Sequence, residues 1–220
     1  MSIMNVVGER GINEIVHFTS NHGLVGTLEV GAVLSRRQLP EVDHLAYIAA
    51  PTSAQRQEAM SCFDKAEDWL DFINLSLSEI NQHYFNFAAN KWHTQGDRWW
   101  TILSFRPEIL THAGVFFTTT NNIYEHVIRG QGQSGLEALF TEPIKRKGSW
   151  YARRNGRTDN LATCQQAEVL YPQSLAMDHL QRIYVATEEQ HDLVSGWLRY
   201  YRLNSVSVTI QPEKFNGVPN

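Results

Sequence analysis

Short runs of β-forming hydrophobic residues recur along the chain and predict strands. Residues 99–105 (WWTILSF) form a nearly continuous apolar run, which is typical of a central strand that is buried on both faces. Residues 205–210 (SVSVTI) alternate strictly between polar and apolar side chains, which predicts an edge strand. The same reasoning predicts further strands at residues 14–19, 69–77, 113–117, 167–171 and 182–187.

Helical signals are found between these strands. Apolar side chains recur at helical spacing over residues 188–201 and predict an amphipathic helix. Residues 23–30 predict a short helix that ends at Gly31, and Pro107 opens a helical turn. Thr52 or Ser53 can cap a helix over residues 51–63, which places Arg56 in its first turn. We also expect a helix over residues 122–129.

The order of these elements predicts the fold class. Strands and helices are interleaved without a regular strand-helix-strand period, which favours an α+β fold with a mixed or antiparallel sheet. The glycine-rich stretch RGQGQSG (residues 129–135) lacks the lysine and the preceding strand of a phosphate-binding loop, so we interpret it as a flexible loop.

Length and composition fit one soluble domain. The 220 residues, of which 42% are hydrophobic, are enough for a single domain over residues 1–220. No apolar stretch reaches the ~18 residues of a membrane span, and the first residues do not resemble a signal peptide. Cys62 and Cys164 lie far apart without metal-ligand spacing, and the nine histidines are scattered. We therefore expect a cytoplasmic protein that uses no metal and does not bind a membrane.

Charge is unevenly distributed. The net charge is -4, yet residues 145–157 carry six positive charges and no negative one, so the rest of the chain sums to -10. Aromatic residues are interleaved with these cations, a combination suited to phosphates and unpaired bases. A solvated surface loop is the alternative interpretation. The predicted nucleic-acid-binding residues are Lys145, Arg146, Lys147, Trp150, Tyr151, Arg153, Arg154 and Arg157.

Two further residues stand out on their own. Glu168 lies in an otherwise apolar predicted strand, where a charge is costly unless it faces a cleft or is paired. An outward-facing strand carboxylate is the alternative. His17 also lies in a predicted strand, where a histidine can contact a ligand or be a hydrogen-bonded core residue.

Five motifs follow one another along the chain: IVHFTSNHGLVGTLEVGAVLSR (15–36), PTSAQR (51–56), DFINLSLSEIN (71–81), ILSFRPEILTHAGVFFTTTN (102–121) and QAEVLYPQSLAMDHLQRIYV (166–185). Together they resemble one family, the DarT-type ADP-ribosyltransferases. These are toxins of bacterial toxin-antitoxin systems that attach ADP-ribose from NAD⁺ to DNA bases. The last motif is the most specific, because it matches the family's catalytic glutamate in an A-E-V-L strand.

The resemblance implies an ADP-ribosyltransferase fold, with a split mixed β-sheet, an NAD⁺ cleft and flanking helices. It implies that Glu168 is catalytic, and that Arg56 contacts the phosphates or assists the base. It also implies that residues 130–166 contain the substrate-recognition loop. The implied NAD⁺-binding residues are His17, Phe18, Thr19, Asn21, Arg56, Asn74, Ser76 and Tyr84.

The acceptor and the partners are further expectations. The segment NLSLSEINQHYF (residues 74–85) departs from thymidine-modifying members, which favours guanine over thymine and leaves the pocket roles of Asn74, Ser76, Asn81 and Tyr84 open. RNA or protein acceptors, and a non-catalytic nucleic-acid-binding module, are the alternatives. The expected partners are single-stranded DNA and an antitoxin that removes ADP-ribose, and the expected state is a monomer.

Overall fold

The computed structural model describes residues 2–39, 69–92 and 97–218. The first half of the chain forms α1 (Ile3–Arg10), β1 (Ile15–Ser20), α2 (Asn21–Val30), β2 (Ala32–Leu34), η1 (Trp69–Asp71), β3 (Phe72–Leu77), α5 (Gln82–Phe87), η2 (Ala88–Trp92), β4 (Trp100–Phe105) and η3 (Pro107–Thr111). The second half forms β5 (Phe116–Thr118), β6 (Arg129–Gln131), α6 (Gly132–Ala138), β7 (Ile144–Lys145), β8 (Tyr151–Ala152), β9 (Glu168–Pro172), β10 (Ser174–Ala176), η4 (Met177–His179), β11 (Leu180–Val185), α7 (Glu188–Tyr200), β12 (Ser207–Ile210) and η5 (Pro212–Asn216).

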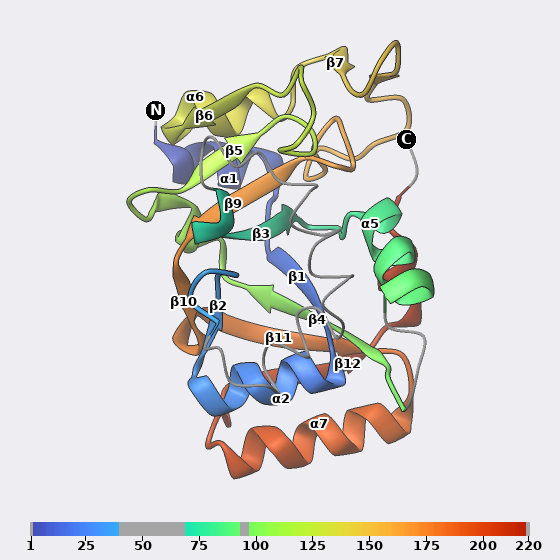
Figure 1. Cartoon of the computed structure of the whole chain (residues 1–220). Coiled ribbons are helices and arrows are strands. Elements are labelled where there is room, and N and C mark those ends of the chain that lie inside the picture. Colours follow the sequence, from blue (N-terminus) through green and yellow to red (C-terminus); the bar gives the residue numbers. More distant parts are fainter. Residues whose placement is uncertain (1, 40–68, 93–96, 219–220) are drawn as a thin grey trace.

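An eight-stranded sheet with the order β12-β11-β4-β1-β3-β9-β5-β6 crosses the molecule (Figure 1). Only the β11–β12 pair is parallel, so the described sheet is mixed, as predicted. The strand from residues 100–105 is central, and the strand at residues 207–210 lies at one edge, also as predicted.

The sheet is split between β1 and β3. These strands pair at Ile15↔Leu77 and Val16↔Ser76 only, whereas β1 pairs with β4 along its whole length. Beyond Val16 the two strands diverge, and the sheet divides into a half containing β4 and β11 and a half containing β9 and β5.

Helices cover the sheet and share one hydrophobic core. In Figure 1, α2 and α7 lie below the sheet, and α1 and α6 lie above it. The core includes Leu24 from α2, Leu136 from α6 and Val194 from α7, all fully buried. Local signals define α2, because the Ser20 hydroxyl accepts from the Gly23 N–H at 3.2 Å and Gly31 ends the helix in the left-handed conformation.

Three local predictions were wrong. Residues 122–129 form a turn instead of a helix, because tertiary hydrogen bonds occupy the polar groups of Asn122. Residues 69–71 form a 3₁₀ turn before β3, and the strand predicted at 113–117 begins only at Phe116. The predicted helix at residues 51–63 lies outside the described residues.

The glycine-rich stretch at residues 129–135 is ordered, not a flexible loop. It forms β6 and the start of α6, which approach each other at Gly130 and Gly135. A Cβ on Gly135 would lie 2.5 Å from the carbonyl carbon of Gly130, closer than any Cβ can approach. Both glycines are therefore required by the packing between strand and helix.

This contact predicts opposite effects for two glycine substitutions. Gly135→Ala should lower the free energy of unfolding by about 1–3 kcal/mol, because the backbone of Gly130 must move. Gly196→Ala in α7, where a Cβ meets nothing within 4 Å, should raise it by about 0.5–1 kcal/mol. Urea unfolding of both variants measures the difference. Equal stability of Gly135→Ala and wild type would show that the strand and helix are not tightly packed there.

Candidate functional site

A cavity of about 650 Å³ opens where the sheet splits. Its walls come from β1, α2 and β2 on one side, from β3 and α5 on another, and from the turn at residues 121–124. Aromatic and polar side chains are mixed in this lining. Glu168, the first residue of β9, is its buried carboxylate.

Glu168 is held by hydrogen bonds on both carboxylate oxygens. The side-chain amide of Asn74 donates to Oε1 at 2.9 Å, and the backbone N–H of Asn122 donates to Oε2 at 2.8 Å. The residue is only 8% exposed. Burial raises the pKa of Glu168 to about 7, while the two hydrogen bonds act in the opposite direction by favouring the carboxylate. The geometry therefore excludes the outward-facing strand carboxylate.

Asn74 links Glu168 to His17 across the split. The Nδ1 of His17 lies 2.9 Å from the carbonyl oxygen of Asn74. Because a carbonyl can only accept, Nδ1 carries the proton and the lone pair is on Nε2. Burial lowers the pKa of His17 below its ordinary value, which favours the neutral ring. Burial thus favours a neutral imidazole at the cavity wall, and the contact with Asn74 orients the ring.

Most of the predicted cofactor-binding residues are brought together here. Phe18, Thr19, Ser76 and Tyr84 line the cavity together with His17 and Asn74. The rings of Phe18 and Tyr84 lie 5.8 Å apart, which gives this part of the wall an aromatic character.

Asn21 is an exception, because it is buried and bonded elsewhere. Its side-chain amide donates to the carbonyl of Asp97 at 3.2 Å and its carbonyl oxygen accepts from the Trp99 N–H at 3.4 Å. These bonds fix the start of β4, and Asn21 is not among the described residues that line the cavity. Arg56, predicted to be catalytic and cofactor-binding, lies outside the described residues.

Two cations contribute to the cavity wall. Arg36, which follows β2, and Lys147, from the loop between β7 and β8, both line it. Lys147 belongs to the basic segment, so this segment reaches the mouth of the cavity. Arg36 lies at the end of the first motif of the resemblance, where its place in the sequence makes it an alternative to Arg56 as the functional arginine.

The basic segment forms a hairpin with an exposed aromatic tip. Its strands β7 and β8 pair at Ile144↔Ala152 and Lys145↔Tyr151. Trp150 is 74% exposed and Tyr151 is 52% exposed. Arg153 and Lys147 are exposed as well, whereas Lys145 and Arg146 are partly buried.

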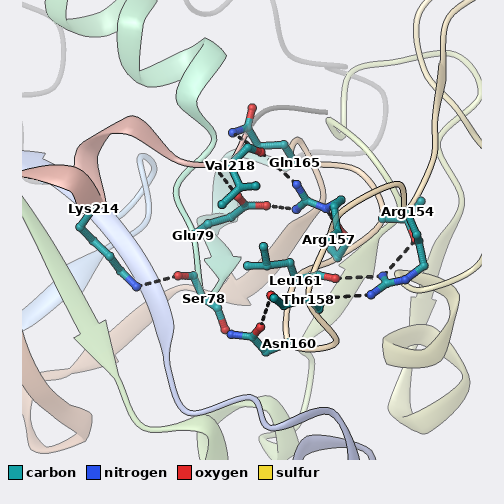
Figure 2. A network of polar contacts seen from close by, with 12 residues as sticks. Ser78, Glu79, Arg154, Arg157, Thr158, Asn160, Leu161, Gln165, Lys214 and Val218 are labelled. Atoms are coloured by element: carbon teal, nitrogen blue, oxygen red, sulfur yellow. Dashed lines mark hydrogen bonds and ion pairs between the residues drawn. The ribbon is translucent and has the colours of Figure 1, made fainter.

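Arg154 and Arg157 have a different environment from the rest of the segment (Figure 2). Arg157 is buried, forms an ion pair with Glu79 and donates to the carbonyl oxygens of Ala162 and Val218 at 2.6 and 3.0 Å. The Arg154 guanidinium donates to the carbonyls of Leu161 and Thr158, each at 3.0 Å. Both arginines therefore bind within the loop that follows β8; the Arg157 side chain is buried there, whereas Arg154 is partly exposed.

Sequence reasoning missed Asn122 and Arg129. Arg129 donates through Nε to the side-chain oxygen of Asn122 at 2.7 Å and through Nη2 to its carbonyl oxygen at 2.8 Å. A signal was present in the TTTNN stretch (residues 118–122), whose threonines are all buried, but the motif alone did not indicate a turn over a carboxylate.

Neither a metal site nor a membrane-spanning helix is found in the part of the chain that the structure describes. No cluster of three His, Cys, Asp or Glu residues there could hold a metal ion. Among the described helices, none has the length and apolar character needed to cross a membrane.

The raised pKa of Glu168 predicts a pH-dependent stability. Below about pH 4.5 the carboxyl is protonated in both states; between 4.5 and about 7 the folded state keeps a proton that the unfolded state loses. Wild-type stability should therefore fall over this interval relative to Glu168→Gln, by up to about 3 kcal/mol, and the difference should stay constant above it.

Urea unfolding of wild type and Glu168→Gln at pH 5 and pH 8 measures this change. Glu125→Gln is the matched control, because the Glu125 side chain is 88% exposed in the neighbouring turn. A stability difference independent of pH would contradict the burial of an ionisable carboxyl at residue 168.

Comparisons with known proteins agree with this geometry. A family model described as "ssDNA thymidine ADP-ribosyltransferase, DarT" matches residues 16–216. No curated protein matches the chain.

Solved structures show the same fold at low sequence identity. DarT from Thermus sp. 2.9 in complex with ADP-ribosylated ssDNA is 16% identical, with a TM-score of 0.63 over 93% of this chain and 96% of that one. The complex of Thermus sp. 2.9 DarT with NAD⁺ gives 16% identity and a TM-score of 0.61, over 92% and 97% of the two chains. Thermosipho africanus DarTG in complex with ADP-ribose is 13% identical, with a TM-score of 0.55 over 92% of this chain and 51% of that one. The family match covers most of the chain, so the protein belongs to the DarT family of ssDNA thymidine ADP-ribosyltransferases.

Proposed function

We propose that this protein transfers ADP-ribose from NAD⁺ to a base of single-stranded DNA and releases nicotinamide, with Glu168 as the catalytic carboxylate. The observation that carries this proposal is the position of Glu168. It is a buried carboxylate, fixed on both oxygens, in the wall of a cavity formed by the split of the sheet.

The cavity fits a dinucleotide co-substrate. A volume of about 650 Å³ lies within the range of small-molecule pockets. We assign His17 and Thr19 to the nicotinamide ribose and amide, and Phe18 and Tyr84 to an apolar face of the same pocket. Arg36 is the lining cation suited to the pyrophosphate. The Thermus sp. 2.9 relative in complex with NAD⁺ supports NAD⁺ as the co-substrate.

Glu168 has two tasks in the reaction. When the glycosidic bond to nicotinamide breaks, the bonding electrons leave with nicotinamide and the ribose acquires oxocarbenium character, which the carboxylate stabilises. As a nitrogen of the DNA base bonds to the anomeric carbon, its proton passes to Glu168. A carboxyl with a pKa of about 7 is a stronger base than an exposed glutamate and is still substantially ionised at neutral pH.

The exposed part of the basic segment is suited to the DNA strand. Trp150 and Tyr151 offer rings for stacking, and Arg153 and Lys147 offer charges for phosphates. Lys147 also lines the cavity, so a strand on this surface would reach the cavity wall. The relative in complex with ADP-ribosylated ssDNA supports single-stranded DNA as the acceptor.

The base and the biological setting are the finer parts of the proposal. The family description names thymidine, whereas the segment at residues 74–85 led us to favour guanine. We retain a toxin role in the cytoplasm, an ADP-ribose-removing antitoxin and a monomeric state as parts of the proposal.

Mass spectrometry of oligonucleotides tests the reaction. Incubation with NAD⁺ and four single-stranded oligonucleotides, each containing one candidate base, should add one ADP-ribose to the thymine or the guanine strand. Glu168→Gln should lower the rate at least about 100-fold, because the amide cannot accept the proton. The fold should be retained, because Asn74 can rotate its amide so that the glutamine is hydrogen-bonded on both sides.

Glu125→Gln, which removes an exposed charge nearby, should react like wild type. Full activity of Glu168→Gln would overturn the assignment of Glu168. Modification of RNA or protein, but of no DNA strand, would show that the acceptor is RNA or protein instead of DNA. If NAD⁺ is never consumed, the result would favour a non-catalytic nucleic-acid-binding module.

Trp150→Ala tests the DNA surface. Loss of one stacked base should raise the Kd for single-stranded DNA about 5- to 150-fold, since stacking contributes about 1–3 kcal/mol. Tyr200→Ala is the control, because Tyr200 is 80% exposed on α7, at the opposite end of the molecule in Figure 1. Fluorescence anisotropy measures both. Equal losses in the two variants, or none in either, would contradict the assignment of the hairpin.

A further inference from the structure

Arg129 lies in one row with Glu168 across three neighbouring strands. Thr118 of β5 pairs with Glu168 of β9 on one side and with Arg129 of β6 on the other. Directly paired residues of adjacent strands project from the same face of a sheet. Arg129 and Glu168 therefore share a face, two strands apart, and the turn at residues 121–126 folds between them.

The turn is fixed at Asn122 by Arg129. The guanidinium binds both the side-chain oxygen and the backbone oxygen of Asn122, at 2.7 and 2.8 Å. It also packs over the ring of Trp69, with 5.2 Å between the guanidinium carbon and the ring centroid. A planar fork held by two acceptors and a ring has little freedom to move.

Other described hydrogen bonds flank Asn122 or close the turn at its ends. The Ile123 N–H donates to the Oδ1 of Asn121 at 3.1 Å, and the Val127 N–H donates to the carbonyl of Tyr124 at 3.1 Å. The Thr119 N–H donates to the carbonyl oxygen of Ile128 at 3.1 Å, and the Ile128 N–H donates to the Thr119 hydroxyl at 3.2 Å. The Tyr124 N–H donates to the carbonyl of Asn121 at 3.0 Å. These contacts join the two ends and shape the chain on either side, whereas the Arg129 fork grips Asn122 itself.

We propose that Arg129 is a positioning residue for the reaction: its fork on Asn122 keeps the Asn122 N–H directed at Oε2 of Glu168. The proposal rests on the proposed function of Glu168. Arg129 itself does not touch the reacting atoms, and acts through one backbone hydrogen bond.

This contact sets the ionisation of Glu168. A donor on Oε2 favours the carboxylate, so its loss raises the pKa of Glu168 above about 7 and leaves less of the ionised form at neutral pH. Among the described residues, the other ionisable groups that line the cavity are His17, Arg36, His83, Tyr84, Tyr124 and Lys147. Burial lowers the pKa of His17, which favours its neutral form.

Arg129→Gln should shift the titration of Glu168 upward by about one pH unit. Two measurements follow it: the Cδ resonance of ¹³C-labelled Glu168, identified by its absence in Glu168→Gln, and kcat/KM for NAD⁺ against pH. Wild-type kcat/KM should rise through about pH 7 and then level off. In Arg129→Gln it should be about fivefold lower at pH 7 and recover near pH 9, since the rate follows the ionised fraction.

Two further variants separate positioning from charge and from stability. Arg129→Lys keeps the charge but not the fork, and should show most of the shift. Arg182→Gln is the matched control, because Arg182 also binds side-chain oxygens, of Ser207 at 3.3 Å and Tyr184 at 3.2 Å, and packs over the Tyr184 ring. It lies on β11, in the other half of the sheet, and should leave the titration unchanged.

The outcomes distinguish this proposal from the assignment of Glu168. An unchanged Glu168 resonance titration in Arg129→Gln overturns the positioning role, as does a normal titration in Arg129→Lys. A shifted resonance titration with an unshifted kcat/KM profile supports the fork and overturns the catalytic role of Glu168. Shifts of the same size in both measurements support both.

Discussion

The short pairing between β1 and β3 is the constraint on which the site depends. Strands that paired along their length would bring β3 against β1 and leave no space at the sheet's centre. Pairing ends after Val16↔Ser76, and the His17 ring then reaches the carbonyl of Asn74 at 2.9 Å. A side chain thus satisfies a backbone acceptor that the opening of the sheet leaves without a strand partner. The cavity and the buried carboxylate both follow from this opening.

Local sequence signals predicted the parts of the fold that local physics determines. The apolar run at residues 99–105, the alternation at 205–210 and the cap and stop of α2 each reflect interactions within a few residues. Glu168 stood out because a charge in an apolar strand requires an explanation, and the resemblance to the family then implied its catalytic role. The sequence could not indicate the turn at residues 121–126, since its hydrogen bonds come from Arg129 and from β9, 46 residues away in the case of Glu168.

The basic segment shows why the number of charges in a sequence segment does not define a binding surface. Trp150 and Arg153 are exposed, but Arg157, four residues further along, is buried against Glu79. The Glu79 side chain also accepts from the Val218 N–H at 3.0 Å, so the pair joins the segment before α5, the loop that follows β8 and the C-terminal segment (Figure 2). A buried pair of this kind costs desolvation, and removal of one partner leaves an unpaired buried charge. Periodicity and composition cannot predict that Arg157 pairs with Glu79, because the two residues are far apart in the sequence.

The pKa of Glu168 is set by two opposing effects, burial in the opening of the sheet and hydrogen bonds from the groups around the carboxylate. Burial disfavours the carboxylate and raises the pKa of Glu168. Asn74 and Asn122 supply the two donors that oppose burial, and the resulting pKa of about 7 leaves a group that is partly ionised at neutral pH and a stronger base than an exposed glutamate, as its proposed role requires. Each donor is itself fixed from elsewhere: Asn74 by the pairing of β3 with β9, and Asn122 by Arg129. The ionisation of Glu168 therefore depends on contacts from the strands on both sides of β9, β3 on one side and β6 on the other.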